Sequence, residues 1–129
     1  MFDSLCCIYP CVPFLTADIL KAAYARFVAA GCDALTPVVR YAHPIQRALR
    51  INERGFLEYR EPCYAASRTQ DLEPMFHDAG MFYFLKAYVL ERTDNRTLAY
   101  ELDALHVQDI DTPADWKHAE MKYRLLQHV

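Results

Sequence analysis

The chain has 129 residues, 53% hydrophobic and 24% charged, with a formal net charge of −3, which predicts a single globular domain over residues 1–129. Its basic residues are scattered, which argues against nucleic acid as a partner, because phosphate neutralisation needs a concentrated basic patch. No apolar run has membrane-spanning length and no leader pattern is present, so we expect no membrane partner and a cytoplasmic location.

The first predicted element is a strand at residues 5–9, where the continuous apolar run L-C-C-I-Y is typical of an interior strand covered on both faces. The loop after it, to Leu15, is a candidate wall of a ligand site, because open α/β sheets bind ligands beyond the carboxyl ends of their strands. A helix over residues 16–30 follows, with Thr16 as its N-cap and Gly31 beyond its end.

A strand over residues 34–39 would complete a β-α-β crossover with these elements. Residues 46–51 and 56–59 then predict a hairpin, and residues 60–79 are irregular and polar, as functional loops often are. Two further strands are expected after Gly80 and at residues 98–102. These elements predict an α/β fold with a mostly parallel, mixed sheet flanked by helices.

The five cysteines are an odd number and lack the paired spacing of a zinc site. A disulfide framework is typical of small secreted proteins, which this composition does not resemble. We therefore expect buried, reduced thiols that pack as small apolar groups.

The segment V-Q-D-I-D-T-P-A-D-W at residues 107–116 contains two acidic residues spaced two apart. In an extended strand at residues 106–110, Asp109 and Asp111 would project from one face and could hold a divalent cation. The alternative is that the two acids only solvate a turn. Thr112 and Asp115 then predict the capped start of a final helix. Its core face is expected to carry Trp116, Ala119, Tyr123 and Leu126.

Four ordered motifs now permit a comparison with a known family. They are H-P-I-Q-R-A-L-R-I-N at residues 43–52, S-R-T-Q-D-L-E-P at residues 67–74, H-D-A-G-M-F-Y at residues 77–83, and the segment at residues 107–116. Together they resemble the sugar-acid cytidylyltransferases, the family of CMP-sialic acid synthetase (acylneuraminate cytidylyltransferase) and pseudaminic acid cytidylyltransferase. The second motif and the D-A-G segment favour the pseudaminic acid branch.

The resemblance implies a Rossmann-like domain of the nucleotide-diphospho-sugar transferase type. It also implies a cytoplasmic, homodimeric nucleotidyltransferase that uses CTP, a nonulosonic sugar acid and Mg²⁺. Members begin with a glycine-rich A-R-G-G-S-K loop that holds the CTP phosphates, and this sequence contains no such loop. We therefore expect the chain to correspond to the carboxyl-terminal portion of the family domain and to be inactive alone.

The resemblance further implies roles for residues at matching positions. Asp109 and Asp111 match the Mg²⁺-binding aspartates, and with Arg68 and Gln70 they are the implied catalytic residues. The implied substrate-binding residues are Gln46, Arg47, Arg68, Gln70, His77 and Asp78. Sialate enzymes carry lysine at the position of Gln46, so Arg47 is expected to supply the positive charge. The alternative function is a non-catalytic sugar-acid-binding or dimerisation module that has lost the nucleotide loop.

Overall fold

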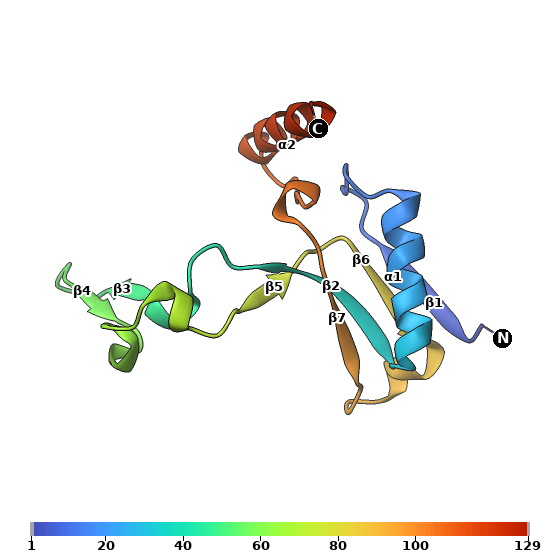
Figure 1. Cartoon of the computed structure of the whole chain (residues 1–129), viewed down its shortest axis with the longest axis horizontal. Coiled ribbons are helices and arrows are strands. Elements are labelled where there is room, and N and C mark those ends of the chain that lie inside the picture. Colours follow the sequence, from blue (N-terminus) through green and yellow to red (C-terminus); the bar gives the residue numbers. More distant parts are fainter. Residues whose placement is uncertain (1, 129) are drawn as a thin grey trace. The chain divides into compact units, whose positions relative to one another are not determined.

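The protein is described here by a computed structural model that covers residues 2–128. It forms two compact units, drawn in Figure 1: one contains the residues up to Val39 and from Asp78 onward, and the other is Arg40–His77. The helices are α1 (Ala17–Ala30) and α2 (Pro113–Gln127), and the strands are β1 (Ser4–Ile8), β2 (Ala34–Arg40), β3 (Leu49–Ile51), β4 (Leu57–Tyr59), β5 (Phe76–Asp78), β6 (Phe82–Lys86) and β7 (Thr97–Glu101). Neither helix within residues 2–128 has the length and hydropathy needed to cross a bilayer.

The main sheet is mostly antiparallel, so the expected parallel, Rossmann-like sheet is wrong. Its order is β1-β6-β2-β5, with β7 also paired to β2. Both β1 and β2 run antiparallel to β6, and the β2–β7 pair is parallel. The helix α1 therefore connects two strands of the same direction, as expected, but β6 lies between them. Hydrophobic periodicity reports burial and not which strand lies alongside, so it did not predict this insertion.

The sequence predicted that strand β1 lies in the interior of the sheet, and this is wrong: β1 lies at the edge. It pairs with β6 along Ser4–Ile8, and its apolar side chains remain accessible, with Leu5 40% and Ile8 48% exposed. An edge strand presents unpaired backbone groups, and this one contains no charged residue that would discourage pairing with another chain.

The prediction of buried thiols holds only for Cys32, whose Sγ donates to the Phe27 carbonyl at 3.6 Å. The exposed cysteines are Cys6, Cys7, Cys11 and Cys63. Their exposure follows from their positions, because edge strands and surface turns leave even apolar side chains accessible. Cys6 is nevertheless partly covered, and this partial burial raises the pKa of its thiol, to which the neighbouring Cys7 adds.

Helix α1 begins and ends as predicted. The Thr16 hydroxyl accepts a hydrogen bond from Ile19 N at 3.2 Å, which satisfies one of the free N–H groups of the first turn. Gly31 closes the helix with φ of 56°, a left-handed conformation that glycine adopts without a steric penalty. The helix thus lies between two local stop signals, and it buries Ala23 and Phe27 against the sheet.

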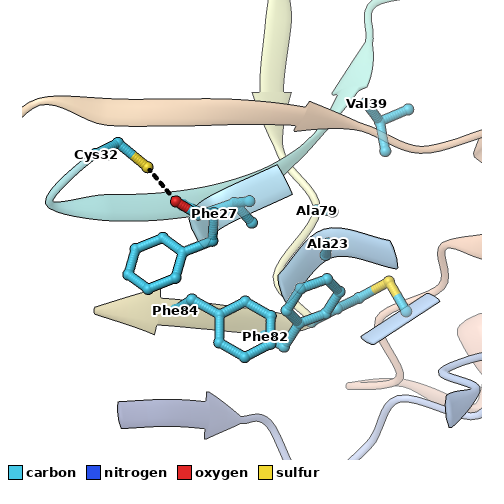
Figure 2. Close-up of a cluster of buried hydrophobic side chains, with 9 residues drawn as sticks. Ala23, Phe27, Cys32, Val39, Ala79, Phe82 and Phe84 are labelled. Atoms are coloured by element: carbon cyan, nitrogen blue, oxygen red, sulfur yellow. Dashed lines mark hydrogen bonds between the residues drawn. The ribbon is translucent and has the colours of Figure 1, made fainter. Parts of the chain in front are cut away.

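The hydrophobic core lies between α1 and the strands β2 and β6 (Figure 2). Phe27 and Phe82 are fully buried, as is Leu35. The ring of Phe84 lies 5.8 Å from that of Phe27 and 5.7 Å from that of Phe82, measured between centroids. Aromatic pairs at these separations add to the stabilisation from buried area.

A hydrogen-bond network holds the start of β2 to the segment before β7. The Asp33 carboxylate accepts from the Tyr88 hydroxyl at 2.6 Å and from Arg96 N at 2.8 Å. The Arg96 side chain also donates to the Gly31 carbonyl at 2.8 Å. These contacts, the Tyr88 hydrogen bond most of all, hold the pKa of Asp33 below its usual range.

We expect Tyr88→Phe to reduce the loss of stability in acid. Because the folded-state pKa of Asp33 lies below the unfolded value, its stabilisation is complete above about pH 4 and is lost as the pH falls through the folded-state pKa. The variant should have a lower free energy of unfolding at neutral pH and a smaller decrease below about pH 4. Urea unfolding at several pH values tests this, with Tyr123→Phe as the control. A steeper acid loss in Tyr88→Phe would contradict it.

The second unit contains the predicted hairpin, formed by β3 and β4. The Asn52 side chain organises its turn, since Oδ1 accepts from Arg54 N and Phe56 N, each at 3.0 Å. A salt bridge of 2.9 Å joins Arg50 and Glu58 across the strands, with the Arg50 side chain largely exposed and that of Glu58 partly exposed. The expected strand beginning at residue 46 is shorter, because a 3₁₀ turn occupies Ile45–Arg47.

Candidate functional site

The segment that carries Asp109 and Asp111 is not a strand, so the expected strand at residues 106–110 is wrong. Asp103 begins a 3₁₀ turn at Ala104–His106, and its Oδ1 accepts from Leu105 N at 2.7 Å. Residues 107–110 have no regular secondary structure. Strand alternation therefore does not place both carboxylates on one face, and their placement depends on the turn and on α2.

Helix α2 starts as the sequence predicted, with a complete capping box. The Thr112 hydroxyl accepts from Asp115 N at 3.2 Å, and Asp115 Oδ2 accepts from Thr112 N at 2.9 Å. The same oxygen accepts from Asp111 N at 3.3 Å. These bonds, led by those from Thr112, lower the pKa of Asp115 and fix the backbone directly after the candidate metal ligands.

The carboxylates of Asp109 and Asp111 are exposed and have oxygens available for a cation. Asp109 Oδ1 accepts from Ile110 N at 3.0 Å, while its other oxygen and both Asp111 oxygens accept no hydrogen bond from residues 2–128. Mg²⁺ commonly takes one or two protein carboxylates and completes its shell with water and phosphate. The donor chemistry fits that ion. No group of three or more His, Cys, Asp or Glu side chains within residues 2–128 is arranged for a metal.

The aromatic side chains of α2 do not form a core, contrary to the sequence prediction. Trp116 is 59% and Tyr123 57% exposed, and in this helix only Ala119 is buried. They line an apolar pocket of about 170 Å³ together with Pro13, Phe14, Ile110, Ala119 and Glu120. Because Ile110 lies between Asp109 and Asp111 in the sequence, this pocket adjoins the acidic segment. The loop after β1 forms one wall, and its predicted role in ligand binding stays a prediction.

Gln46 and Arg47 lie in the second unit, on the 3₁₀ turn Ile45–Arg47. Gln46 Nε2 donates to the Glu73 carbonyl at 2.9 Å, which ties this turn to the polar segment of residues 67–74. Gln46 Oε1 and Arg47 Nε are shielded from solvent, yet neither has a hydrogen-bond partner within residues 2–128. Buried polar atoms normally have a partner, so these two atoms are exceptions in the second unit.

Arg68 directly precedes the turn Thr69–Asp71 of the second unit, and Gln70 lies within it. Both side chains are exposed. His77 lies in β5, where its ring is 5.0 Å from that of Tyr41. The structure thus places five of the predicted substrate residues in one unit. It places Asp78 in the other unit, together with both aspartates of the acidic segment.

Asp78 has a neighbour that sequence analysis missed. Its carboxylate accepts from Gly80 N at 2.8 Å and from the Tyr83 hydroxyl at 3.0 Å. The Tyr9 ring lies edge-on to that of Tyr83, with centroids 5.5 Å apart. Burial, followed by hydrogen bonds with Tyr9 and Asp78, raises the pKa of Tyr83. The signal was present in the run M-F-Y-F-L, where a polar ring alternates with fully apolar ones.

Lys122 was also missed. Its ammonium group donates to the carbonyls of Ala104 at 3.0 Å and Val107 at 2.6 Å, just before the acidic segment. In the sequence it is one of two lysines in this helix, and no local pattern distinguishes it from Lys117.

Comparison with known proteins confirms the resemblance that the motifs predicted. No family model matches the chain. Two curated proteins of Campylobacter jejuni, of serotypes O:2 and O:23/36, are 35% and 34% identical over 97% of this chain, and both are named pseudaminic acid cytidylyltransferase. A Helicobacter pylori protein is 27% identical over 84% of the chain and is named pseudaminic acid cytidylyltransferase and UDP-2,4-diacetamido-2,4,6-trideoxy-beta-L-altropyranose hydrolase. The chain spans 56% of the length of each Campylobacter relative and 22% of the Helicobacter one.

Proposed function

We propose that this chain is the part of a pseudaminic acid cytidylyltransferase that recognises the sugar acid and holds Mg²⁺. The observation that carries the proposal is the match to two relatives of that name over 97% of the chain. The reaction would join CTP to pseudaminic acid or a related nonulosonic acid and release pyrophosphate. Homodimer formation belongs to the same proposal, supported by the accessible apolar side chains of β1.

The reaction needs neutralisation of phosphate charge more than covalent chemistry from the protein. In the proposed step the anomeric hydroxyl of the sugar acid attacks the α-phosphorus of CTP, a new P–O bond forms, and pyrophosphate leaves. Asp109 and Asp111 would hold the Mg²⁺, which when bound offsets charge on the phosphate oxygens. Their exposed, largely unbonded carboxylate oxygens support this assignment.

The second unit would bind the sugar acid. Arg68 is exposed, and a guanidinium can fork onto the carboxylate that such substrates carry. Gln70 lies one residue beyond the same turn's start and would add an amide contact. Gln46 and Arg47 lie in the same unit, and the buried Gln46 Oε1 and Arg47 Nε have no hydrogen-bond partner within residues 2–128, so a change of side-chain conformation on binding would let them contact the sugar acid. His77 of β5 remains a proposed contact of this unit, and Asp78 remains a proposed substrate residue of the first unit.

The second candidate function is a non-catalytic sugar-acid-binding or dimerisation module. One observation favours it: the three glycines, Gly31, Gly55 and Gly80, are far apart, so this sequence has no glycine-rich segment to hold a triphosphate. A module of this kind would bind the sugar acid through the second unit without turning over CTP.

Pyrophosphate release from CTP and pseudaminic acid tests the proposal. We expect no turnover by the purified chain, because it contains no glycine-rich phosphate loop. A chimera is expected to turn over when this chain replaces the matching segment of the serotype O:2 Campylobacter relative. Mg²⁺-dependent turnover by the chain alone would contradict the first expectation. A folded chimera that binds pseudaminic acid but never releases pyrophosphate would favour the non-catalytic module.

A further inference from the structure

Two side chains of α2 hold the acidic segment, one at each end. Asp115 and Lys122 are seven residues apart, about two helical turns, so they project from the same face of the helix. Asp115 Oδ2 accepts from Asp111 N and Thr112 N, at the carboxyl end of the segment. Lys122 reaches the amino end.

The contacts of Lys122 are with backbone carbonyls and not with carboxylates. Its half-buried ammonium group donates to the backbone carbonyls of Ala104 and Val107, at 3.0 and 2.6 Å, and forms no salt bridge within residues 2–128. A hydrogen bond from a charged donor is about twice as strong as a neutral one. Burial lowers the pKa of Lys122, and the two carbonyls offset that cost by satisfying its donors.

The residues between these two anchors need such support. Residues 107–110 have no strand or helix hydrogen bonds, so their backbone would otherwise sample many conformations. A cation that binds two carboxylates from such a segment must order it first, which weakens binding. If the backbone is already held at Val107 and Asp111, the segment that carries Asp109 and Asp111 is ordered before the cation binds, so binding does not have to order it.

We propose that Lys122 is a positioning residue, which holds the backbone at Ala104 and Val107 so that Asp109 and Asp111 are presented together to a divalent cation. This inference rests on the proposed function, in which those aspartates are the Mg²⁺ ligands. Lys122 acts through the backbone and does not touch the cation or the substrate.

Two possible roles of Lys122 predict opposite changes in cation binding when its charge is removed. If Lys122 acted only as a nearby positive charge, its removal would strengthen cation binding, because like charges repel. If it positions the segment, its removal weakens binding. The test variant is Lys122→Met, which keeps the apolar stem and removes the donor. The matched control is Lys117→Met, which removes the same charge from an exposed position of α2 whose side chain forms no hydrogen bond within residues 2–128.

Binding of Mn²⁺ to the full chain, followed by electron paramagnetic resonance, gives the first readout. We expect Lys122→Met to weaken binding at least tenfold, Lys117→Met to leave it unchanged or slightly stronger, and Lys122→Arg to restore most of it. The second readout needs no metal. Amide hydrogen exchange should become faster over residues 105–111 in Lys122→Met, while circular dichroism shows that the helices remain.

Each outcome decides the inference. Unchanged or stronger Mn²⁺ binding by Lys122→Met, in a chain where Asp109→Asn and Asp111→Asn abolish binding, would overturn the positioning role and leave the metal site intact. Mn²⁺ binding that survives both aspartate changes would overturn the metal site and this inference with it. Should Lys122→Met lose helix α2, Lys122→Leu, which also removes the donor and favours helix, replaces it in both measurements.

Discussion

Replacing Asp109 or Asp111 by Asn is expected to lower the turnover of the chimera by on the order of a hundredfold or more while leaving its fold intact. Each change removes one negative charge from a site that holds a cation against phosphate oxygens, and such stabilisation is worth several kcal/mol. Every 1.36 kcal/mol of barrier is about tenfold in rate, which gives the expected loss. Steady-state pyrophosphate release at increasing Mg²⁺ is the measurement, and high Mg²⁺ should recover part of the activity.

The structure explains why the fold should survive these changes. Asp109 uses one oxygen to accept from Ile110 N, and the amide oxygen of Asn can accept the same bond. The Asp111 side chain accepts no hydrogen bond from residues 2–128, and the capping box is made by Thr112 and Asp115. Glu101→Gln is the control, because it removes the same charge from an exposed position on β7. Full activity in both aspartate variants would show that the acids only solvate a turn.

Replacing Phe27 by Ala is expected to lower the free energy of unfolding by about 3–5 kcal/mol. Phe27 is completely buried, packs against the rings of Tyr24 and Phe84, and has the Lys86 ammonium 5.2 Å from its ring centroid. The change removes buried apolar area and leaves a cavity between α1 and β6, where Figure 2 shows the ring. Since a domain is stable by only about 5–15 kcal/mol, much of the total would be lost.

Urea unfolding followed by circular dichroism measures this effect. Phe56→Ala is the matched control, because the same side chain is 67% exposed there and should cost little. A loss below about 1 kcal/mol for Phe27→Ala would mean that this cluster is not the core of the first unit.

Elements whose signals are local were predictable from the sequence. Helix α1 lies between Thr16 and Gly31, and both residues act through contacts within one turn of the helix. The capping box of Thr112 and Asp115 is equally local and was also predicted. The hairpin followed from its turn, where Asn52 accepts hydrogen bonds from residues two and four positions on.

Features that depend on distant partners were not predictable. The apolar run of β1 gave no indication that β6 would separate it from β2, because alternation does not encode strand order. The spacing of Trp116 and Tyr123 predicts a helix face correctly, but whether that face is covered depends on what packs against it. In the acidic segment, residues 107–110 form no strand, and the contacts of Lys122 with this region span 15 residues of sequence or more.

The exposed position of Trp116 determines which changes in the protein its fluorescence can report. It is the single tryptophan of the sequence and is already 59% exposed in the folded chain, so unfolding will move its indole only a little further into water. Its fluorescence is therefore a poor probe of global unfolding. The indole instead borders the pocket that Ile110 shares, so quenching by iodide or acrylamide will follow whatever covers that pocket beside the two aspartates.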